Sequence, residues 1–280
     1  MTTEGLRASR RFAPEMALIS KPKQVPASRF AQLRPAKLVL WYGDVRDSLP
    51  PEVVPYAEIT DLLLLTNTGH LPLYHRAGFR VAAFWPLASP PCFAPLPSPP
   101  SGRAVDVAFL GNSWPGHTNA DDRLNILRQV SQKFQLRLYG KGWKGFRQEE
   151  IMGPAIMQDA ARALAGAKLT IGMQHYRYVA LAQSNRTWTH MSCGKCHLNW
   201  YVPDLERLFK HRVHQVFWDD AEELERELRY YLDRPAERLR IGAQARAYIL
   251  EAHTFDHRVE TMHKYLKGQR ENTPWEMVLT

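Results

Sequence analysis

The sequence lacks any run of about 18 apolar residues, the length that a helix needs to span a lipid bilayer. The first twenty residues also lack an apolar core of signal-peptide length, because they include Glu4, three arginines and Pro14. Cysteine is scarce, and three cysteines cannot form a disulfide framework. These absences argue against a membrane-spanning or disulfide-stabilised protein and predict a cytoplasmic one.

Two of the cysteines, Cys193 and Cys196, have C-x-x-C spacing, and His190 and His197 lie beside them. This spacing is found in redox pairs and in halves of zinc sites. A structural zinc ion needs four ligands, however, and the sequence has no second C-x-x-C pair. We therefore favour the interpretation that both cysteines pack at a helix-to-strand turn, and we predict no metal site.

Blocks of like charge are also missing, although the chain is basic overall. Lys and Arg total 37 and Asp and Glu total 28, which gives a net charge of +9 with no run of five like charges. A basic chain suits a phosphorylated substrate, a nucleic acid or an anionic membrane surface. A solvated basic surface without a partner explains the same composition.

The first part of the chain alternates short apolar runs, each closed by turn residues, with stretches of helical pattern. Continuous apolar runs of this length are typical of parallel strands that are buried on both faces. The alternation predicts a parallel sheet with crossover helices. The expected strands are 16–19, 37–42, 62–66 and 81–85, and the expected helices include 28–33 and 71–77.

A proline-rich stretch separates this pattern from a second one. Six of the fourteen residues from 88 to 101 are proline, which excludes a helix or a central strand. We interpret the stretch as a link between two domains. The predicted divisions are an acceptor-side domain at 1–100, a donor-binding domain at 101–252, and a C-terminal helix and tail at 253–280 that could pack back on the first domain.

After the link the alternation starts again. Asp219 and Asp220 precede a helix in which leucine recurs every four residues, and Asp is a preferred N-cap residue. The expected strands are 106–110, 136–139, 168–172, 196–202 and 215–218. The expected helices are 122–134, 156–165, 185–193, one after 219–220, one opened by Pro235, and 255–266.

Two parallel α/β domains bind ligands at the carboxyl ends of their strands. The G-x-G-x-x-G fingerprint of dinucleotide-dependent dehydrogenases is absent, and so is the phosphate-binding G-x-x-x-x-G-K-[ST] loop. The lack of an export signal weakens the interpretation as a periplasmic-type binding protein.

Ser184-Asn185-Arg186-Thr187 opens one of the expected helices. The N-terminus of a helix presents unpaired N–H groups and a positive dipole end, which suit a phosphate. The guanidinium of Arg186 adds donors that match phosphate oxygens. Taken alone, these residues fit ordinary helix capping equally well, with Arg186 in solvent.

Several segments, taken in order, resemble the CgeB-like (spore maturation protein-like) family of glycosyltransferases. The resemblance covers nearly the whole chain, and its separate motifs are short. They include W-Y-G-D-V-R-D at 41–47, D-V-A-F-L-G-N at 106–112, L-Y-G-K-G-W at 138–143, S-N-R-T-W at 184–188, Y-V-P-D-L-E-R-L-F at 201–209 and H-T-F-D-H-R-V at 253–259.

The resemblance implies the GT-B architecture, an α/β fold with two facing Rossmann-like domains and parallel sheets, the first domain being shortened here. It implies a nucleotide-sugar donor held mainly by the second domain, and no metal or other cofactor. No Asp-x-Asp motif of the metal-dependent type is present. The implied donor-binding residues are Gly111, Asn112, Gly140, Lys141, Trp143, Ser184, Asn185, Arg186, Thr187 and Thr189.

Two positions depart from related glycosyltransferases. Related glycosyltransferases often have a Glu on the donor helix that can accept hydrogen bonds from a ribose, and the corresponding residue here is Thr189. Retaining enzymes have another Glu eight residues earlier, and the corresponding residue here is Leu181. A threonine hydroxyl cannot bind two ribose hydroxyls as a carboxylate does. The sugar, the base of the donor, the stereochemistry and the activity itself therefore stay open.

The candidates for catalysis come from the first domain. Asp44 directly follows the expected strand 37–42, and His70 has a similar place after the third strand. We predict Asp44 as the general base and His70 as the second candidate, although Asp44 also fits a turn or N-cap role.

Three functions stay open at this point. The first is metal-independent sugar transfer from a nucleotide sugar to an unknown acceptor. The second is the same reaction on modified bases of DNA or RNA, which the +9 charge suggests. The third is a degenerate relative that binds a nucleotide or a glycan without catalysis, which Thr189 and Leu181 suggest.

Overall fold

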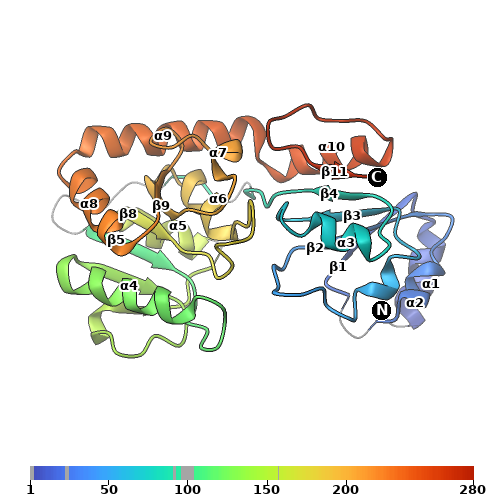
Figure 1. Ribbon diagram of the computed structural model, residues 1–280, viewed down its shortest axis with the longest axis horizontal. Helices are drawn as coiled ribbons and strands as arrows, with labels where there is room; N and C mark the ends of the chain where they lie inside the picture. Colours follow the sequence, from blue (N-terminus) through green and yellow to red (C-terminus); the bar gives the residue numbers. More distant parts are fainter. Residues whose placement is uncertain (1–2, 23–24, 91–92, 96–103, 157) are drawn as a thin grey trace. The chain divides into compact units, whose positions relative to one another are not determined.

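The computed structural model describes residues 3–22, 25–90, 93–95, 104–156 and 158–280 (Figure 1). They form two compact units, each of which is made of separate segments of the chain. Unit 1 contains Met1–Pro86, Val179–Ala182 and Arg258–Thr280, and unit 2 contains Leu87–Tyr178 and Gln183–His257. In these described residues, no helix is long and apolar enough to cross a membrane.

The first division between the units falls at Pro86, before the proline-rich stretch and not at its end near residue 100. The cause is visible at Ser89, which is buried and whose backbone N–H donates to the carbonyl of His253 at 3.0 Å. This bond attaches the start of the stretch to unit 2. Most of the remaining stretch, residues 91–92 and 96–101, lies outside the described residues.

Unit 1 contains a five-stranded sheet in the order β1-β2-β3-β4-β11. The first four strands are parallel, and β11 pairs antiparallel with β4. All four residues of β3 are buried because both faces of the sheet are covered. The bounds are β1 Met16–Ser20, β2 Lys37–Tyr42, β3 Leu62–Leu65, β4 Ala82–Phe84 and β11 Val278–Leu279.

The last helix, α10 (Phe255–Leu266), belongs mostly to unit 1. Its Met262 and Tyr265 pack with buried residues of β2, β3 and β4. The indole N–H of Trp85 donates to the carbonyl of Arg258 at 2.7 Å, and the Arg258 side chain donates to Pro86 at 2.8 Å. The other helical elements of unit 1 are α1 Thr3–Phe12, α2 Ala27–Ala31, the 3-10 turn Val54–Tyr56 and α3 Leu71–Arg76.

Unit 2 contains a six-stranded, wholly parallel sheet in the order β10-β9-β8-β5-β6-β7. From β5 the chain builds the sheet outward through β6 and β7, and then returns to start β8 on the other side of β5. The order therefore reverses between β5 and β8, where open α/β sheets bind ligands. The bounds are β5 Val105–Leu110, β6 Leu136–Tyr139, β7 Ile151–Gly153, β8 Ala167–Gly172, β9 His197–Trp200 and β10 Val216–Trp218.

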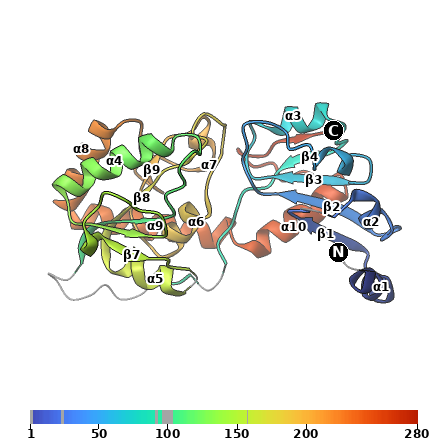
Figure 2. The ribbon, with the colours of Figure 1, turned by 90° about the horizontal axis from the view of Figure 1, so that it is seen from below.

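Helices cover both faces of the unit 2 sheet. Figure 2 shows α4 and α8 on one side of this sheet and α5 on the other. Leu127 of α4 and Leu228 of α8 belong to the larger core cluster, whereas Leu164 of α5 belongs to the opposite one. The bounds are α4 Ala120–Lys133, α5 Gln158–Ala165, α6 Asn185–Ser192, α7 Leu205–Leu208, α8 Ala221–Leu232 and α9 Pro235–Ala252.

Two local predictions for unit 2 can be compared with the structure directly. Asp220 caps α8, since its carboxylate accepts a hydrogen bond from the Glu223 N–H at 2.8 Å, so the predicted cap is confirmed. Cys193 and Cys196 are buried at the turn between α6 and β9, and burial raises the pKa of the Cys196 thiol to about 12. A protonated, inaccessible thiol is unreactive.

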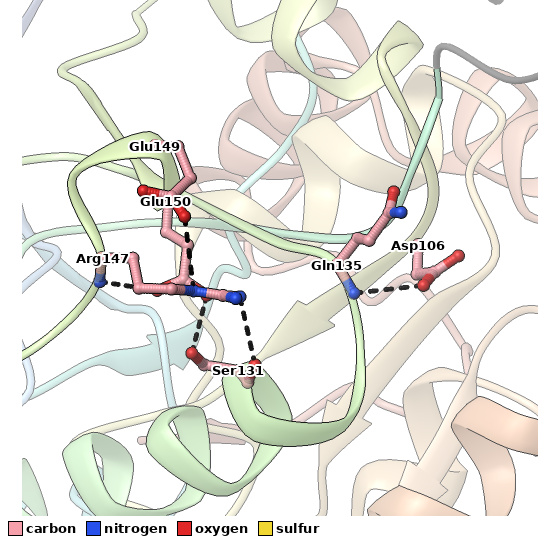
Figure 3. A network of polar contacts seen from close by, with 6 residues as sticks. All are labelled: Asp106, Ser131, Gln135, Arg147, Glu149 and Glu150. Atoms are coloured by element: carbon pink, nitrogen blue, oxygen red, sulfur yellow. Dashed lines mark hydrogen bonds and ion pairs between the residues drawn. The ribbon is translucent and has the colours of Figure 1, made fainter.

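A buried carboxylate fixes the loop that joins β6 to β7 (Figure 3). Glu150 is 2% exposed and accepts hydrogen bonds from the Ser131 hydroxyl at 2.6 Å and from the Arg147 backbone at 2.9 Å. The Arg147 guanidinium adds an ion pair at 2.7 Å. Burial alone raises the pKa of Glu150, but these hydrogen bonds outweigh it and lower that pKa overall.

Candidate functional site

The candidate site lies in unit 2, at the carboxyl ends of β5, β6 and β8. Gly111 follows β5 and Gly140 follows β6, and the two turns are too close for side chains. A Cβ on Gly140 would lie 2.1 Å from the Gly111 carbonyl oxygen, and one on Gly111 would lie 2.5 Å from Nη2 of Arg186. Glycine at both positions therefore lets the two turns and the arginine meet.

Asn112 and Lys141 join the same two turns. The Asn112 side-chain oxygen accepts a hydrogen bond from the Lys141 N–H at 2.8 Å, and the Lys141 carbonyl accepts one from the Ser113 N–H at 2.9 Å. The Lys141 residue is exposed. Its ammonium group is therefore accessible to a ligand at this edge of the sheet.

Arg186, in the first turn of α6, points back over the end of the sheet. Its Nε donates to the Leu110 carbonyl at the end of β5, and its Nη1 donates to Met173 and to the Ser184 hydroxyl at 3.0 and 3.1 Å. The guanidinium carbon lies 4.8 Å from the centre of the Phe109 ring. The surrounding protein removes water from the guanidinium, which lowers the pKa of Arg186 to about 10 and leaves it charged at neutral pH.

Arg123, on α4, supplies a second cation to the same place. It is 3% exposed, and its guanidinium lies 5.5 Å from the centre of the same Phe109 ring. Nη1 hydrogen-bonds to the imidazole of His175, and Nη2 reaches the Asn112 carbonyl at 3.5 Å. Nε has no partner among the described residues. Burial and then the nearby charge of Arg186 lower the pKa of Arg123 to about 9.

In the part of the chain that the structure describes, neither guanidinium has a carboxylate partner. Two neighbouring cations, Arg123 buried and Arg186 partly buried, repel each other and lose hydration, and the face of one aromatic ring offsets this only in part. An anionic ligand removes that penalty. The arrangement is therefore chemically suited to bind an anion with several oxygens, such as a diphosphate.

The N-terminus of α6 adds a further positive group that an anion would stabilise. Ser184 is its N-cap residue, but no side chain among the described residues caps the helix, and the Ser184 hydroxyl accepts from Arg186 instead. The Thr187 N–H donates to the Ser184 carbonyl at 3.1 Å, and the N–H groups of this first turn carry the positive end of the dipole. They add donors for an anion beside Arg186.

The sequence of this unit identifies its family. A model of the glycosyl transferase-like family matches residues 123–264, just over half of the 280 residues, beginning at the second arginine of the site. The chain belongs to the glycosyl transferase-like family. No curated protein matches the sequence of this glycosyltransferase significantly.

Solved structures resemble the chain as a whole. HepE of Anabaena, in complex with UDP and glucose, aligns with a TM-score of 0.66 at 13% identity, over 93% of this chain and 80% of that one. Sucrose-phosphate synthase of Thermosynechococcus elongatus aligns with a TM-score of 0.67 at 11% identity, over 95% and 77%. A glycosyltransferase of Rickettsia africae aligns with a TM-score of 0.68 at 10% identity, over 96% and 80%. The fold of this glycosyltransferase is therefore GT-B.

The structure gathers most of the predicted donor-binding positions at one sheet edge. Among those gathered, Asn185 is exposed at the start of α6. Their roles as donor ligands stay predictions. The positions brought together are Gly111, Asn112, Gly140, Lys141, Ser184, Asn185 and Arg186.

Three other predicted positions point into the protein instead. Trp143 is 7% exposed and packs edge-on against Phe109 in the core, and its indole N–H has no hydrogen-bond partner among the residues that the structure describes. The Thr187 hydroxyl donates to Gln183 inside the protein, and the Thr189 hydroxyl donates to the Asn185 carbonyl one turn earlier in its own helix. None of the three presents its polar group freely to a ligand in this state.

The two candidate bases lie in unit 1, and their catalytic roles stay predictions. The oxygens of Asp44 form ion pairs with Lys21 at 2.8 Å and with Arg46 at 3.1 Å. His70 precedes α3, and its backbone N–H donates to the Asn67 side-chain oxygen at 2.9 Å. Burial lowers the pKa of His70, so its imidazole is neutral at pH 7.

Two residues of the site, Arg123 and His175, were not predicted from the sequence. Arg123 had a detectable signal, because it precedes Leu127 by four residues and Val130 by seven. It therefore lies on the apolar face of its helix, where a charged residue indicates a structural or functional role. His175 had no such sequence signal, because it lies in a connection without hydrophobic periodicity.

Proposed function

We propose that the protein is a metal-independent glycosyltransferase that uses a nucleoside diphosphate sugar as its donor. The observation that supports this most directly is the pair of guanidiniums, Arg123 and Arg186, at the point where the sheet order reverses. Neither has a carboxylate partner in the described part of the chain. In the bound state the donor diphosphate would supply the missing negative charge.

The same residues would act on the reaction itself. When the bond between the sugar and the diphosphate breaks, negative charge develops on the leaving phosphate. Arg186, Arg123 and the N–H groups of α6 are already in place and need no reorganisation, which is the condition for electrostatic stabilisation of a transition state. They provide the positive charge that a divalent cation supplies in metal-dependent enzymes.

Transfer also needs a group that accepts the proton of the acceptor hydroxyl. Asp44 is the first candidate, but it must give up its ion pair with Lys21 or Arg46 to do so. His70 offers a neutral imidazole at pH 7 because burial lowers its pKa. Both residues follow strands of the unit 1 sheet, on the acceptor side of the predicted architecture.

The nature of the donor and the subfamily belong to this proposal. HepE was solved with UDP and with UDP-glucose, which makes UDP the first nucleotide to test. The segments around Asp106–Asn112 and Ser184–Phe209 favour the CgeB-like subfamily. A cytoplasmic location and a nucleic-acid acceptor stay predictions.

The experiment is calorimetry with UDP, GDP, ADP and CDP and with their glucose derivatives, on wild-type protein and on Arg186→Ala. We expect one nucleotide to bind and Arg186→Ala to weaken it by about 1.5–3 kcal/mol, the range for hydrogen bonds to charged groups. The control is Arg240→Ala, an exposed arginine of α9 in the same unit. Unchanged affinity in Arg186→Ala would refute the proposed site.

Donor turnover separates an enzyme from a binding protein. Slow hydrolysis of the bound nucleotide sugar without acceptor supports the enzyme, whereas binding without any hydrolysis or transfer supports a degenerate relative. The nucleic-acid alternative predicts DNA or RNA binding that weakens steeply with salt.

A further inference from the structure

His175 occupies the connection after β8 and is held by the loop between β5 and α4. Its Nδ1 lies 3.0 Å from the Thr118 carbonyl oxygen, and its own carbonyl accepts a hydrogen bond from the Asn119 side chain at 2.7 Å. Both the imidazole and the backbone of His175 are therefore fixed by the same loop.

These contacts determine the tautomer. Nη1 of Arg123 contacts both ring nitrogens of His175 and can only donate. The Thr118 carbonyl can only accept, and Nδ1 cannot both donate to it at 3.0 Å and accept from Nη1 at 3.1 Å. We assign the proton to Nδ1, because Nη1 still reaches Nε2. Nε2 then has a lone pair and is the acceptor for Arg123.

The charges around His175 favour this neutral form. The groups that face it are Arg123 from α4, Arg186 from α6, and His117 from the loop, whose ring centre is 5.1 Å away. None of these three groups is a carboxylate. Burial, and then the charge of Arg123, lower the pKa of His175 to about 4.

We propose that His175 is a positioning residue, whose Nδ1–H tautomer accepts a hydrogen bond from Arg123 and holds that guanidinium beside Arg186 for the donor diphosphate. The proposal rests on the proposed function. Arg123 needs such a support because no described residue bonds to its Nε, and its other contact, to the Asn112 carbonyl, is long at 3.5 Å. Without His175, repulsion from Arg186 would move Arg123 away from the ligand.

A double-mutant cycle tests whether His175 acts through Arg123. The variants are His175→Ala, Arg123→Ala and the double variant, with UDP as ligand and inorganic pyrophosphate as a probe that lacks a base. We expect each single substitution to weaken binding about 10-fold, and the double variant to bind no more weakly than Arg123→Ala alone. His175→Gln, whose amide oxygen can accept from Arg123, should recover most of the affinity.

The outcomes of the cycle have distinct meanings. Normal affinity in His175→Ala beside weakened binding in Arg123→Ala overturns the positioning role, and so do losses that multiply in the double variant. Unchanged affinity in both Arg123→Ala and Arg186→Ala overturns the proposed function and this proposal with it. Thermal unfolding of each variant without ligand identifies any loss that comes from misfolding.

A spectroscopic measurement tests the tautomer without any ligand. Nitrogen-15 NMR of the imidazole groups, with the His175 signals assigned by their absence in His175→Gln, reports which nitrogen carries the proton. We expect the Nδ1–H form at pH 7, persisting to about pH 5. An Nε2–H tautomer or an imidazolium at pH 7 overturns the proposal even when the proposed function holds.

Discussion

The close approach at Gly111 gives a prediction that can be worked from distances. An added Cβ would lie 2.5 Å from Nη2 of Arg186 and 3.1 Å from the Phe109 ring. The ring is fixed in the core, so the guanidinium must move. It would then lose at least one of its hydrogen bonds, to the Leu110 carbonyl or to the Met173 carbonyl.

One hydrogen bond from a charged group is worth about 1.5–3 kcal/mol. We therefore expect Gly111→Ala to lower the free energy of unfolding by at least that amount, because residues with a side chain rarely adopt the φ of +158° found at Gly111. Because the displaced group is the predicted phosphate ligand, UDP affinity should also fall, by about 10- to 100-fold.

Urea unfolding measures the stability change, and calorimetry with UDP measures the affinity. The matched control is Gly166→Ala in the same unit, where the nearest atom to an added Cβ is at 3.4 Å, an ordinary contact. Its UDP affinity should equal that of the wild type. Normal UDP affinity in Gly111→Ala, with the fold intact, would refute the assignment of Arg186 to the ligand.

Four further predictions follow from the same structure. Gly140→Ala should destabilise far more than Gly111→Ala, because its Cβ would meet backbone at 2.1 Å, and a normal melting temperature would contradict this. Asp44→Asn should reduce turnover about 10²–10⁴-fold with donor affinity retained if Asp44 is the base, and a near-normal rate, with loss in His70→Gln, would move the role to His70. Donor binding and turnover should persist in excess chelator, and loss restored by magnesium would refute the metal-independent proposal. The free energy of unfolding should decrease as the pH is lowered from about 6.5 to about 4, because folding lowers the pKa values of His175 and His197 to about 4 and about 3, so the unfolded chain binds more protons in this range. Each histidine contributes up to about 1.4 kcal/mol per pH unit. A flat pH profile in urea unfolding would contradict this.

Much of the fold was readable from local pattern. The continuous run Leu62–Leu65 and the segment Lys37–Tyr42 predicted buried parallel strands, and both form as expected. The last long helix has the predicted bounds, Phe255–Leu266. The missed elements α7, β7 and β11 have only two to four residues, and the last two depend on pairing with a neighbouring strand. The ten-residue helix α1 was missed as well.

The boundary between the two units was harder to predict from the sequence. Composition placed the boundary at the end of the proline-rich stretch, but the units divide at Pro86. Proline content shows where regular structure stops, and it does not show which core the following residues join. Ser89 joins unit 2 through His253, a residue far along the chain, and only the folded contact determines this.

For the site, the sequence by itself determined the glycine turns after two strands and the Ser184-Asn185-Arg186 helix start. These are local signals, because turns and helix starts depend on neighbouring residues. Only the tertiary structure decided that Arg123 joins Arg186 over Phe109, and that His175 supports it. The reason is physical: the strand order places β5 beside β8, which brings together groups about 50 residues apart in the sequence. The two guanidiniums share the Phe109 ring only once the sheet has formed.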